Sequence, residues 1–73
     1  MPRVAVKSEI PGSVVRIDVG IGDGIEEDDP VITVESMKME IPVSAPIAGR
    51  VAEILVREGD AIAAGQVVAA LET

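Results

Sequence analysis

Apolar and polar side chains alternate along short stretches of this chain with a period of two. The alternation is clearest over residues 15–19, Val-Arg-Ile-Asp-Val, where every second position is apolar, as a half-buried β-strand requires. No segment shows the 3.6-residue period of an amphipathic helix. Prolines at positions 11, 30, 42 and 46 would interrupt any helix that formed. The pattern therefore predicts an all-β fold.

The sequence also contains an internal repeat at an offset of 37 residues. Over residues 6–35, eleven of the thirty aligned pairs are identical, against the roughly three that this composition would give by chance. The identical pairs are Val6/Val43, Ile10/Ile47, Gly12/Gly49, Val14/Val51, Ile17/Ile54, Val19/Val56, Gly22/Gly59, Asp23/Asp60, Ile25/Ile62, Val31/Val68 and Glu35/Glu72. Two copies of one structural motif explain this similarity.

Each copy predicts the same order of elements. These are a strand (Val14–Val19; Val51–Val56), a Gly-Asp turn (Gly22-Asp23; Gly59-Asp60), a short strand around Ile25 or Ile62, a second turn, and a closing strand (Val31–Glu35; Val67–Glu72). Glycine suits the first turn because turns between strands often need positive φ, and the following Asp can bond nearby backbone amides. In the second turn, Asp28-Asp29 of the first copy replaces Gly65-Gln66 of the second, and Asp tolerates the left-handed region less well than Gly.

Two copies with one apolar face each can bury those faces only against each other. We therefore expect a single domain over residues 1–73, a small sandwich or flattened barrel with approximate two-fold symmetry. A two-fold relation places the joint between the copies, Met37-Lys38, at the opposite end of the domain from the chain termini.

Composition narrows the classes of function. Apolar residues make up 48% of the chain, yet there is no Phe, Tyr or Trp, and the formal net charge is −7. Such a chain would repel nucleic-acid phosphates and offer no aromatic side chain for bases to stack on, so we expect no nucleic-acid binding. Without His or Cys there is no zinc set, no thiolate nucleophile and no imidazole base, so we expect neither a metal site nor a self-sufficient enzyme.

Three further stretches have ordinary explanations. No long apolar run follows the first charged residues, which predicts neither a signal peptide nor a membrane span and favours a cytoplasmic location. The acidic run Glu26–Asp29 could dock a basic partner or bind calcium weakly, but its spacing lacks a cation-loop pattern and favours a solvated loop. Residues 20–24 superficially resemble a phosphate-binding glycine loop, but no helix follows, so a turn is the better interpretation.

The joint between the copies carries residues 35–40, Glu-Ser-Met-Lys-Met-Glu. A tight hairpin turn normally has Asn, Asp or Gly at its centre, where φ is positive. Other residues in such a turn would accept unfavourable φ values, at a cost of order 1 kcal/mol or more each. Methionines on both sides of a protruding lysine are also more useful to a partner than to the core. The joint is therefore the candidate functional site.

At these residues the chain resembles the biotinyl domains of the biotin carboxyl carrier proteins and the biotin/lipoyl attachment family, in which the lysine between two methionines is biotinylated. The similarity covers nearly the whole chain, because the turns also match. They are Pro11-Gly12, Gly22-Asp23, Ala45-Pro46, Ala48-Gly49, Gly59-Asp60 and Gly65-Gln66. The resemblance implies a flattened barrel of two four-stranded antiparallel sheets, with the lysine on a tight hairpin at one end.

The resemblance also implies a function and a set of partners. Biotin would be attached covalently to Lys38, with Met37 and Met39 recognised by the partners. The domain would be a non-catalytic, monomeric carrier that is loaded by a biotin protein ligase and takes CO2 from a biotin carboxylase to a carboxyltransferase. Because a lysine amine is almost entirely protonated near neutral pH, the ligase would supply the base.

The other motif residues are weaker candidates. Glu35, Ser36 and Glu40 belong to the same motif and would flank the hairpin or contribute to recognition. Glu35 is identical to Glu72 of the second copy, which has no lysine to serve, so a solvated strand end explains it equally well. Ser36 stands where many members of the family have Ala. The short run from Gly20 to Pro30 leaves no space for the protruding insertion of some bacterial carriers.

Two alternative functions stay open. A lipoyl carrier shares the fold and the hairpin lysine, but it typically has Asp before the lysine and Ala after it, so methionines on both sides favour biotin. An unmodified barrel that acts only as a packing or interaction module would leave the strained tip and its methionines unexplained.

Overall fold

The chain folds entirely into strands and loops. The structure, a computed structural model, describes residues 2–73, so Met1 of the predicted domain lies outside the described part. The strands are β1 (Arg3–Lys7), β2 (Gly12–Ile17), β3 (Gly24–Ile25), β4 (Pro30–Ser36), β5 (Met39–Ser44), β6 (Gly49–Ile54), β7 (Ala61–Ile62) and β8 (Val67–Glu72). Residues 2–73 contain no helix of the length and apolarity needed to cross a membrane. The prediction of an all-β fold is confirmed.

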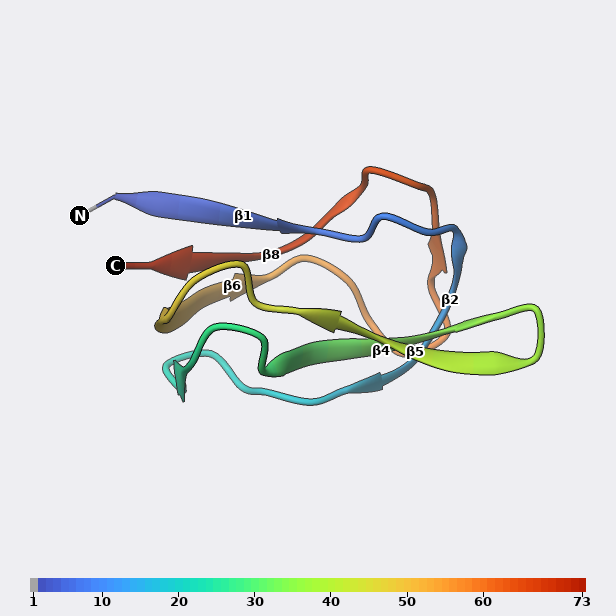
Figure 1. Cartoon of the computed structure of the whole chain (residues 1–73), viewed down its shortest axis with the longest axis horizontal. Helices are drawn as coiled ribbons and strands as arrows, with labels where there is room; N and C mark the ends of the chain where they lie inside the picture. Colours follow the sequence, from blue (N-terminus) through green and yellow to red (C-terminus); the bar gives the residue numbers. More distant parts are fainter. Residues whose placement is uncertain (1) are drawn as a thin grey trace.

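The strands form two four-stranded antiparallel sheets that pack face to face (Figure 1). One sheet has the order β1-β8-β6-β3 and the other the order β5-β4-β2-β7. With β1–β4 assigned to the first copy and β5–β8 to the second, each sheet takes its central strands from one copy and its edge strands from the other. The two copies are therefore interlocked rather than stacked as separate halves.

The predicted two-fold symmetry extends to individual hydrogen bonds. The Gly22 N–H donates to the Val51 carbonyl at 2.7 Å, and 37 residues later the Gly59 N–H donates to the Val14 carbonyl at the same distance. Because residues 14 and 51 are equivalent, the two bonds exchange under the symmetry. The β2–β4 and β6–β8 ladders also shift register at equivalent positions.

One core fills the space between the sheets. Its buried side chains are Val6, Val14, Ile25, Val31, Ile32, Val34, Val43, Ala45, Val51, Val56, Ile62, Val68, Ala69 and Leu71. Most of the identical apolar pairs of the repeat belong to this set, so the repeat marks the core. Full burial of each Val, Ile or Leu stabilises the fold by about 1.5–3 kcal/mol relative to exposure, which is how a chain without aromatic residues holds together.

Two other identities of the repeat are glycines at close approaches between strands. A Cβ on Gly49 would lie 2.6 Å from the carbonyl oxygen of Glu72, and a Cβ on Gly12 would overlap the carbonyl oxygen of Glu35. Any side chain at these positions would push β2 away from β4, or β6 away from β8. Glycine is required at both positions for this packing reason, although neither has a positive φ.

The observed strand bounds agree in part with those predicted from the sequence. Strands β2 and β6 begin and end two residues earlier than the ranges Val14–Val19 and Val51–Val56 that alternation predicts. Strand β8 has the predicted bounds, and β4 extends its prediction by one residue at each end. The pattern does not predict β1 and β5, which are edge strands of different sheets.

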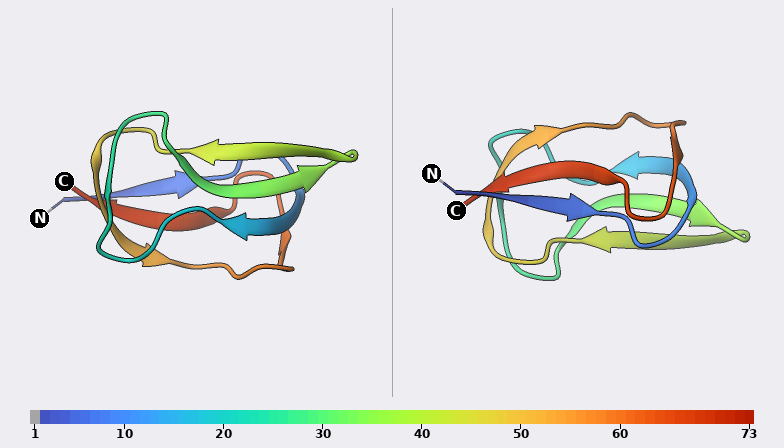
Figure 2. Two further views of the ribbon diagram at one scale, coloured as in Figure 1. Left: turned by 90° about the horizontal axis from the view of Figure 1, so that it is seen from below. Right: turned by 90° about the horizontal axis from the view of Figure 1, so that it is seen from above.

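The molecule is elongated, with the joint and the termini at opposite ends. Its principal extents are 36 × 18 × 17 Å. The start of β1 and the C-terminus lie at one end, and the β4–β5 hairpin projects beyond the other strands at the far end (Figure 2). The placement of Met37-Lys38 predicted from the symmetry is confirmed.

The second turn of the first copy provides a test of backbone strain. Asp28 has φ 72°, where its counterpart Gly65 has φ 83°. Replacing Asp28 with Gly should therefore raise the free energy of unfolding by about 0.5–1 kcal/mol. Denaturation in urea, followed by far-UV circular dichroism because the chain has no aromatic residue, measures the change.

Two matched variants control this test. Gly65→Asp should lower stability by a similar amount, and Glu27→Gly, at a position without positive φ, should not stabilise the fold. A lower stability of Asp28→Gly would contradict the strain argument.

Candidate functional site

The candidate site is the turn that joins β4 to β5. The ladder between these strands continues through the pairs Glu35↔Glu40 and Ser36↔Met39, which leaves Met37 and Lys38 as a two-residue loop. Their φ values are 53° and 65°. Positive φ at both central residues characterises the type I′ turn, whose twist matches that of a hairpin. The strained, non-glycine turn predicted from the sequence is confirmed.

The three central side chains of the motif are presented to solvent. Met37 is 93% exposed and Met39 is 63% exposed, and Lys38 is exposed between them. Within residues 2–73, no hydrogen bond or ion pair holds the Lys38 amine. The tip therefore combines a free primary amine with two unpacked thioether side chains.

The two glutamates of the motif lie directly opposite each other on the hairpin and are both exposed. Like charges at a directly opposed pair destabilise a hairpin. A guanidinium nitrogen of Arg16 lies 4.0 Å from a carboxylate oxygen of Glu40 and offsets part of this repulsion. Glu40 thus has a structural contact, whereas Glu35 has the solvated position that its repeat equivalence indicated. Ser36 is partly buried at the last ladder pair.

A polar network supports the base of the hairpin. Arg16 Nε donates to Asp18 Oδ1 at 2.7 Å, and Arg16 Nη2 donates to the Thr33 hydroxyl at 3.0 Å. The Thr33 hydroxyl in turn donates to Asp18 Oδ2 at 2.8 Å. These bonds tie β2 and the loop that follows it to β4, and the ion pair with Glu40 extends the network to β5.

The network perturbs the ionisation of its carboxylate. Burial raises the pKa of the Asp18 carboxyl, but the hydrogen bonds from Arg16 and Thr33, together with the Arg16 charge, outweigh it. The net effect holds the pKa of Asp18 below its ordinary value. The ionised form of Asp18 is therefore the one that stabilises the folded state.

The alternation and the motifs do not predict this network, although the repeat contains a signal for it. Arg16, Asp18 and Thr33 align with Glu53, Leu55 and Ala70 in the second copy, so all three positions break the repeat. A coordinated departure from symmetry on neighbouring strands marks a feature that only one copy needs. Here it is the copy whose β4 leads into the projecting hairpin.

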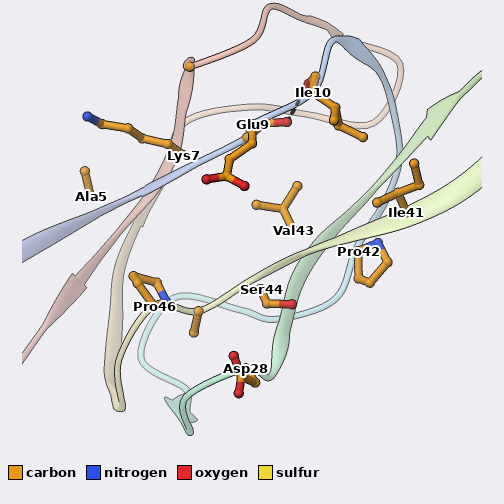
Figure 3. A pocket seen from close by; sticks show the side chains of 13 residues that line it. Ala5, Lys7, Glu9, Ile10, Asp28, Ile41, Pro42, Val43, Ser44 and Pro46 are labelled. Atoms are coloured by element: carbon orange, nitrogen blue, oxygen red, sulfur yellow. Dashed lines mark hydrogen bonds between the residues drawn. The ribbon is translucent and has the colours of Figure 1, made fainter.

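A surface groove lies apart from the tip. A groove of about 830 Å³ runs between the edge strands β1 and β5. Figure 3 shows the Glu9 carboxylate turned toward Val43 in this groove, while the Lys7 amine points away from it. Met37, Lys38 and Met39 do not line the groove. The candidate site is therefore a projection and not a pocket.

The remaining polar stretches behave as turns. The Asp23 carboxylate accepts a hydrogen bond from the Gly20 N–H at 2.8 Å, and the Asp29 carboxylate accepts one from the Glu26 N–H at 3.0 Å. Within residues 2–73 no three His, Cys, Asp or Glu side chains are grouped so as to hold a metal ion. The Asp carboxylates of both stretches are used to close turns.

The tip turn allows a direct test of its strain. Replacing Met37 with Asn and Lys38 with Gly puts the preferred residues of a type I′ turn at the two positive-φ positions, and should raise the free energy of unfolding by about 1 kcal/mol or more. Urea denaturation measures the difference. The same residues at the flanking ladder pair, in Ser36→Asn with Met39→Gly, should lower stability, and stabilisation by both variants would refute the interpretation.

The Asp18 network predicts a dependence of stability on pH. Because the folded-state pKa of Asp18 lies below the unfolded value of about 3.9, its contribution is complete above pH 4 and is lost as pH falls through the folded-state pKa. The variant Asp18→Asn should therefore lose less stability than the original chain between pH 7 and pH 3. Glu27→Gln, which removes an exposed carboxylate, should keep the original loss; an unchanged pH profile in Asp18→Asn would disprove the prediction.

Comparison with known proteins places this geometry in a family. Residues 1–71 match the family model described as biotin-requiring enzyme. The biotinylated protein TB7.3 homolog of Mycobacterium leprae is 46% identical over 66 residues, which cover 90% of this chain and 93% of that protein. The urea carboxylase of Kluyveromyces lactis contains a similar structure, with a TM-score of 0.94 and 35% identity over 99% of this chain but 6% of the carboxylase. The chain thus spans nearly all of one relative and a small part of another.

The lipoyl alternative shares the fold. The lipoyl domain of the 2-oxoglutarate dehydrogenase complex from Azotobacter vinelandii aligns over 86% of this chain and 80% of that domain, with a TM-score of 0.70 and 27% identity. Both values are lower than those for the urea carboxylase. The chain belongs to the biotin/lipoyl attachment family, and within it is a biotin carboxyl carrier domain without catalytic activity of its own.

Proposed function

We propose that Lys38 is the residue that carries biotin. The observation that supports this proposal most directly is the position of its amine, exposed between Met37 and Met39 on a two-residue turn at the far end from the termini. Covalent attachment requires from this chain a primary amine that is free and is presented where a ligase can reach it, which fits this tip. Met37 and Met39 are proposed as the side chains that partners recognise, with Glu35, Ser36 and Glu40 in supporting positions.

In the proposed attachment step, the Lys38 amine attacks the acyl carbon of a biotinyl-adenylate. An amide C–N bond forms, the bond from the acyl carbon to the phosphate oxygen breaks, and AMP leaves. The amine must first lose a proton, which a base of the ligase takes. The domain contributes geometry, because a stiff hairpin holds the amine where a ligase pocket can surround it.

The proposed partners are a biotin protein ligase, a biotin carboxylase and a carboxyltransferase. Biotin, once bound, would form a swinging arm. One of its nitrogens would carry a carboxyl group from the biotin carboxylase to the carboxyltransferase. Tethering makes both encounters local and raises the effective concentration toward the millimolar range when the reach matches the gap. The projecting tip supports this role because the rest of the domain stays clear of the partner's site.

Further parts of the proposal concern the domain as a whole. We infer that the isolated domain is monomeric, works in the cytoplasm and binds neither nucleic acid nor a membrane. The net charge of −7 supports the absence of nucleic-acid binding. Activation of biotin as an adenylate consumes a nucleotide, which supports an intracellular site of loading.

Intact-mass measurement after co-expression tests the attachment site. The chain has two lysines, Lys7 and Lys38, both exposed. With a biotin ligase, the original chain and Lys7→Arg should gain one biotinyl increment, and Lys38→Arg should gain none. A lipoyl increment with a lipoate ligase in its place would favour the lipoyl carrier, and no increment with either ligase would favour an unmodified module.

A second pair of variants tests the geometric part of the proposal. Moving the lysine by one position, in Met37→Lys with Lys38→Met or in Lys38→Met with Met39→Lys, should abolish labelling because the amine leaves its place on the turn. Labelling retained at the original rate would show that presentation by the hairpin is not the mechanism.

A further inference from the structure

We propose that Met37 and Met39 form a second covalent-modification site at the tip. Hydroperoxide oxidants, such as hydrogen peroxide, would convert their thioethers to sulfoxides and so reduce loading of Lys38 by the ligase. This inference rests on the proposed function, because it concerns recognition of the same hairpin.

Composition directs oxidation to this end of the molecule. The chain has no Cys, His, Trp or Tyr, so its methionine thioethers are the side chains most readily oxidised by a peroxide. There are three methionines in the sequence, and two of them flank Lys38. An oxidant that reacts with few other side chains would therefore act mainly at the candidate site.

The exposure of both thioethers makes the reaction accessible. Met37 is 93% exposed, and Met39 is 63% exposed opposite Ser36 at the last ladder pair. Oxidation of a buried methionine disrupts a core, but the described core consists of Val, Ile, Ala and Leu. The sulfoxides at the tip would remain in water, so the fold should keep its stability while its tip changes from apolar to polar.

The chemical step is a two-electron oxygen transfer. A sulfur lone pair attacks one peroxide oxygen, the O–O bond breaks, an S–O bond forms, and the second oxygen leaves as water after proton transfer. Sulfur is oxidised and the peroxide is reduced, with no further reactant. The modification can be reversed by a separate reduction, in which methionine sulfoxide reductases, one for each sulfoxide epimer, restore the thioether with two electrons from a dithiol, which becomes a disulfide, while the oxygen leaves as water.

The effect on recognition follows from desolvation. A partner that encloses the tip removes water from both methionine side chains, which costs nothing for a thioether that packs against apolar atoms. A sulfoxide oxygen enclosed in the same surface loses its hydrogen bonds to water without a partner. Because these hydrogen bonds are lost, we expect a loading rate at least about tenfold lower for the doubly oxidised tip. A tenfold change corresponds to about 1.4 kcal/mol.

A one-tube experiment compares the two states directly. The unbiotinylated chain is partly oxidised with hydrogen peroxide, freed of peroxide, and incubated with a biotin ligase, biotin and ATP. Oxidation before loading avoids the thioether of biotin itself. Intact mass then gives the biotinyl fraction separately for the unoxidised, singly oxidised and doubly oxidised species, so that the unoxidised chain is the internal control.

The oxygens can be assigned to individual methionines. In a sample taken before loading, when the Lys38 amine is still free, cleavage after Arg and Lys places Met1, Met37 and Met39 in three different peptides, because Arg3 and Lys38 separate them. Met37 should be oxidised at least as fast as Met39, in the order of their exposure. Preferential oxidation of Met1, with Met37 and Met39 spared, would overturn the proposal.

The loading rates test whether oxidation of the two methionines weakens recognition by the ligase. Slow loading of the oxidised species, recovered after treatment with both sulfoxide reductases, supports the inference. Equal loading of oxidised and unoxidised chains overturns it and leaves the proposed function intact, whereas failure of the unoxidised chain to accept biotin overturns both. In the control Met37→Leu with Met39→Leu, peroxide should leave the loading rate unchanged relative to the same variant untreated. A peroxide effect that persists in this control would place the sensitivity elsewhere and refute the assignment.

Discussion

The structure depends on one core that two interlocked copies of a motif bury together. Each sheet has its centre from one copy and its edges from the other, so neither copy can form a complete sheet alone. The equivalent valines and isoleucines of the two copies meet in the same apolar layer. Because the core lacks aromatic side chains, close packing of the strands is essential, and the glycines at positions 12 and 49 allow β2 to approach β4 and β6 to approach β8 within each sheet. This shared burial offsets the strain of the turns that connect the strands.

The tip of the molecule is a consequence of this interlocking. The chain must pass directly from the last strand of one copy, β4, to the first strand of the other, β5, and these two are neighbours in one sheet. A long antiparallel ladder therefore reaches its last pair before the chain reverses, and only Met37 and Lys38 remain for the turn. The ladder, together with the Arg16–Asp18–Thr33 network on adjacent strands, holds the backbone of the turn that carries the amine. The tip side chains can be exposed while their backbone is well supported, because the ladder and the network both end before the turn.

The same arrangement separates the reactive groups from the rest of the fold. The scaffold contains aliphatic core residues, turn residues and surface charges, whereas the amine and the two thioethers project from one end. Chemistry at the tip, whether acylation of the amine or oxidation of sulfur, can therefore change what a partner meets without changing the core. A carrier that must visit several partners gains from this separation, because each partner needs to recognise only the tip and its immediate flanks.

The sequence by itself determined the strand periodicity, the repeat of 37 residues, the glycines of the turns and the central place of Lys38 between two methionines. The periodicity and the glycines are local features, and the repeat is found by aligning the chain with itself. The two-fold symmetry of the repeat then predicts that Lys38 lies at the end opposite the termini. Only the tertiary structure decided that the copies exchange edge strands, so that β1 pairs with β8 and β7 with β2, and that Arg16, Asp18 and Thr33 meet across neighbouring strands. The physical reason is that strand pairing and side-chain contact between distant segments depend on how two faces pack, and a period of two records which side chains turn inward but not which strand lies beside them.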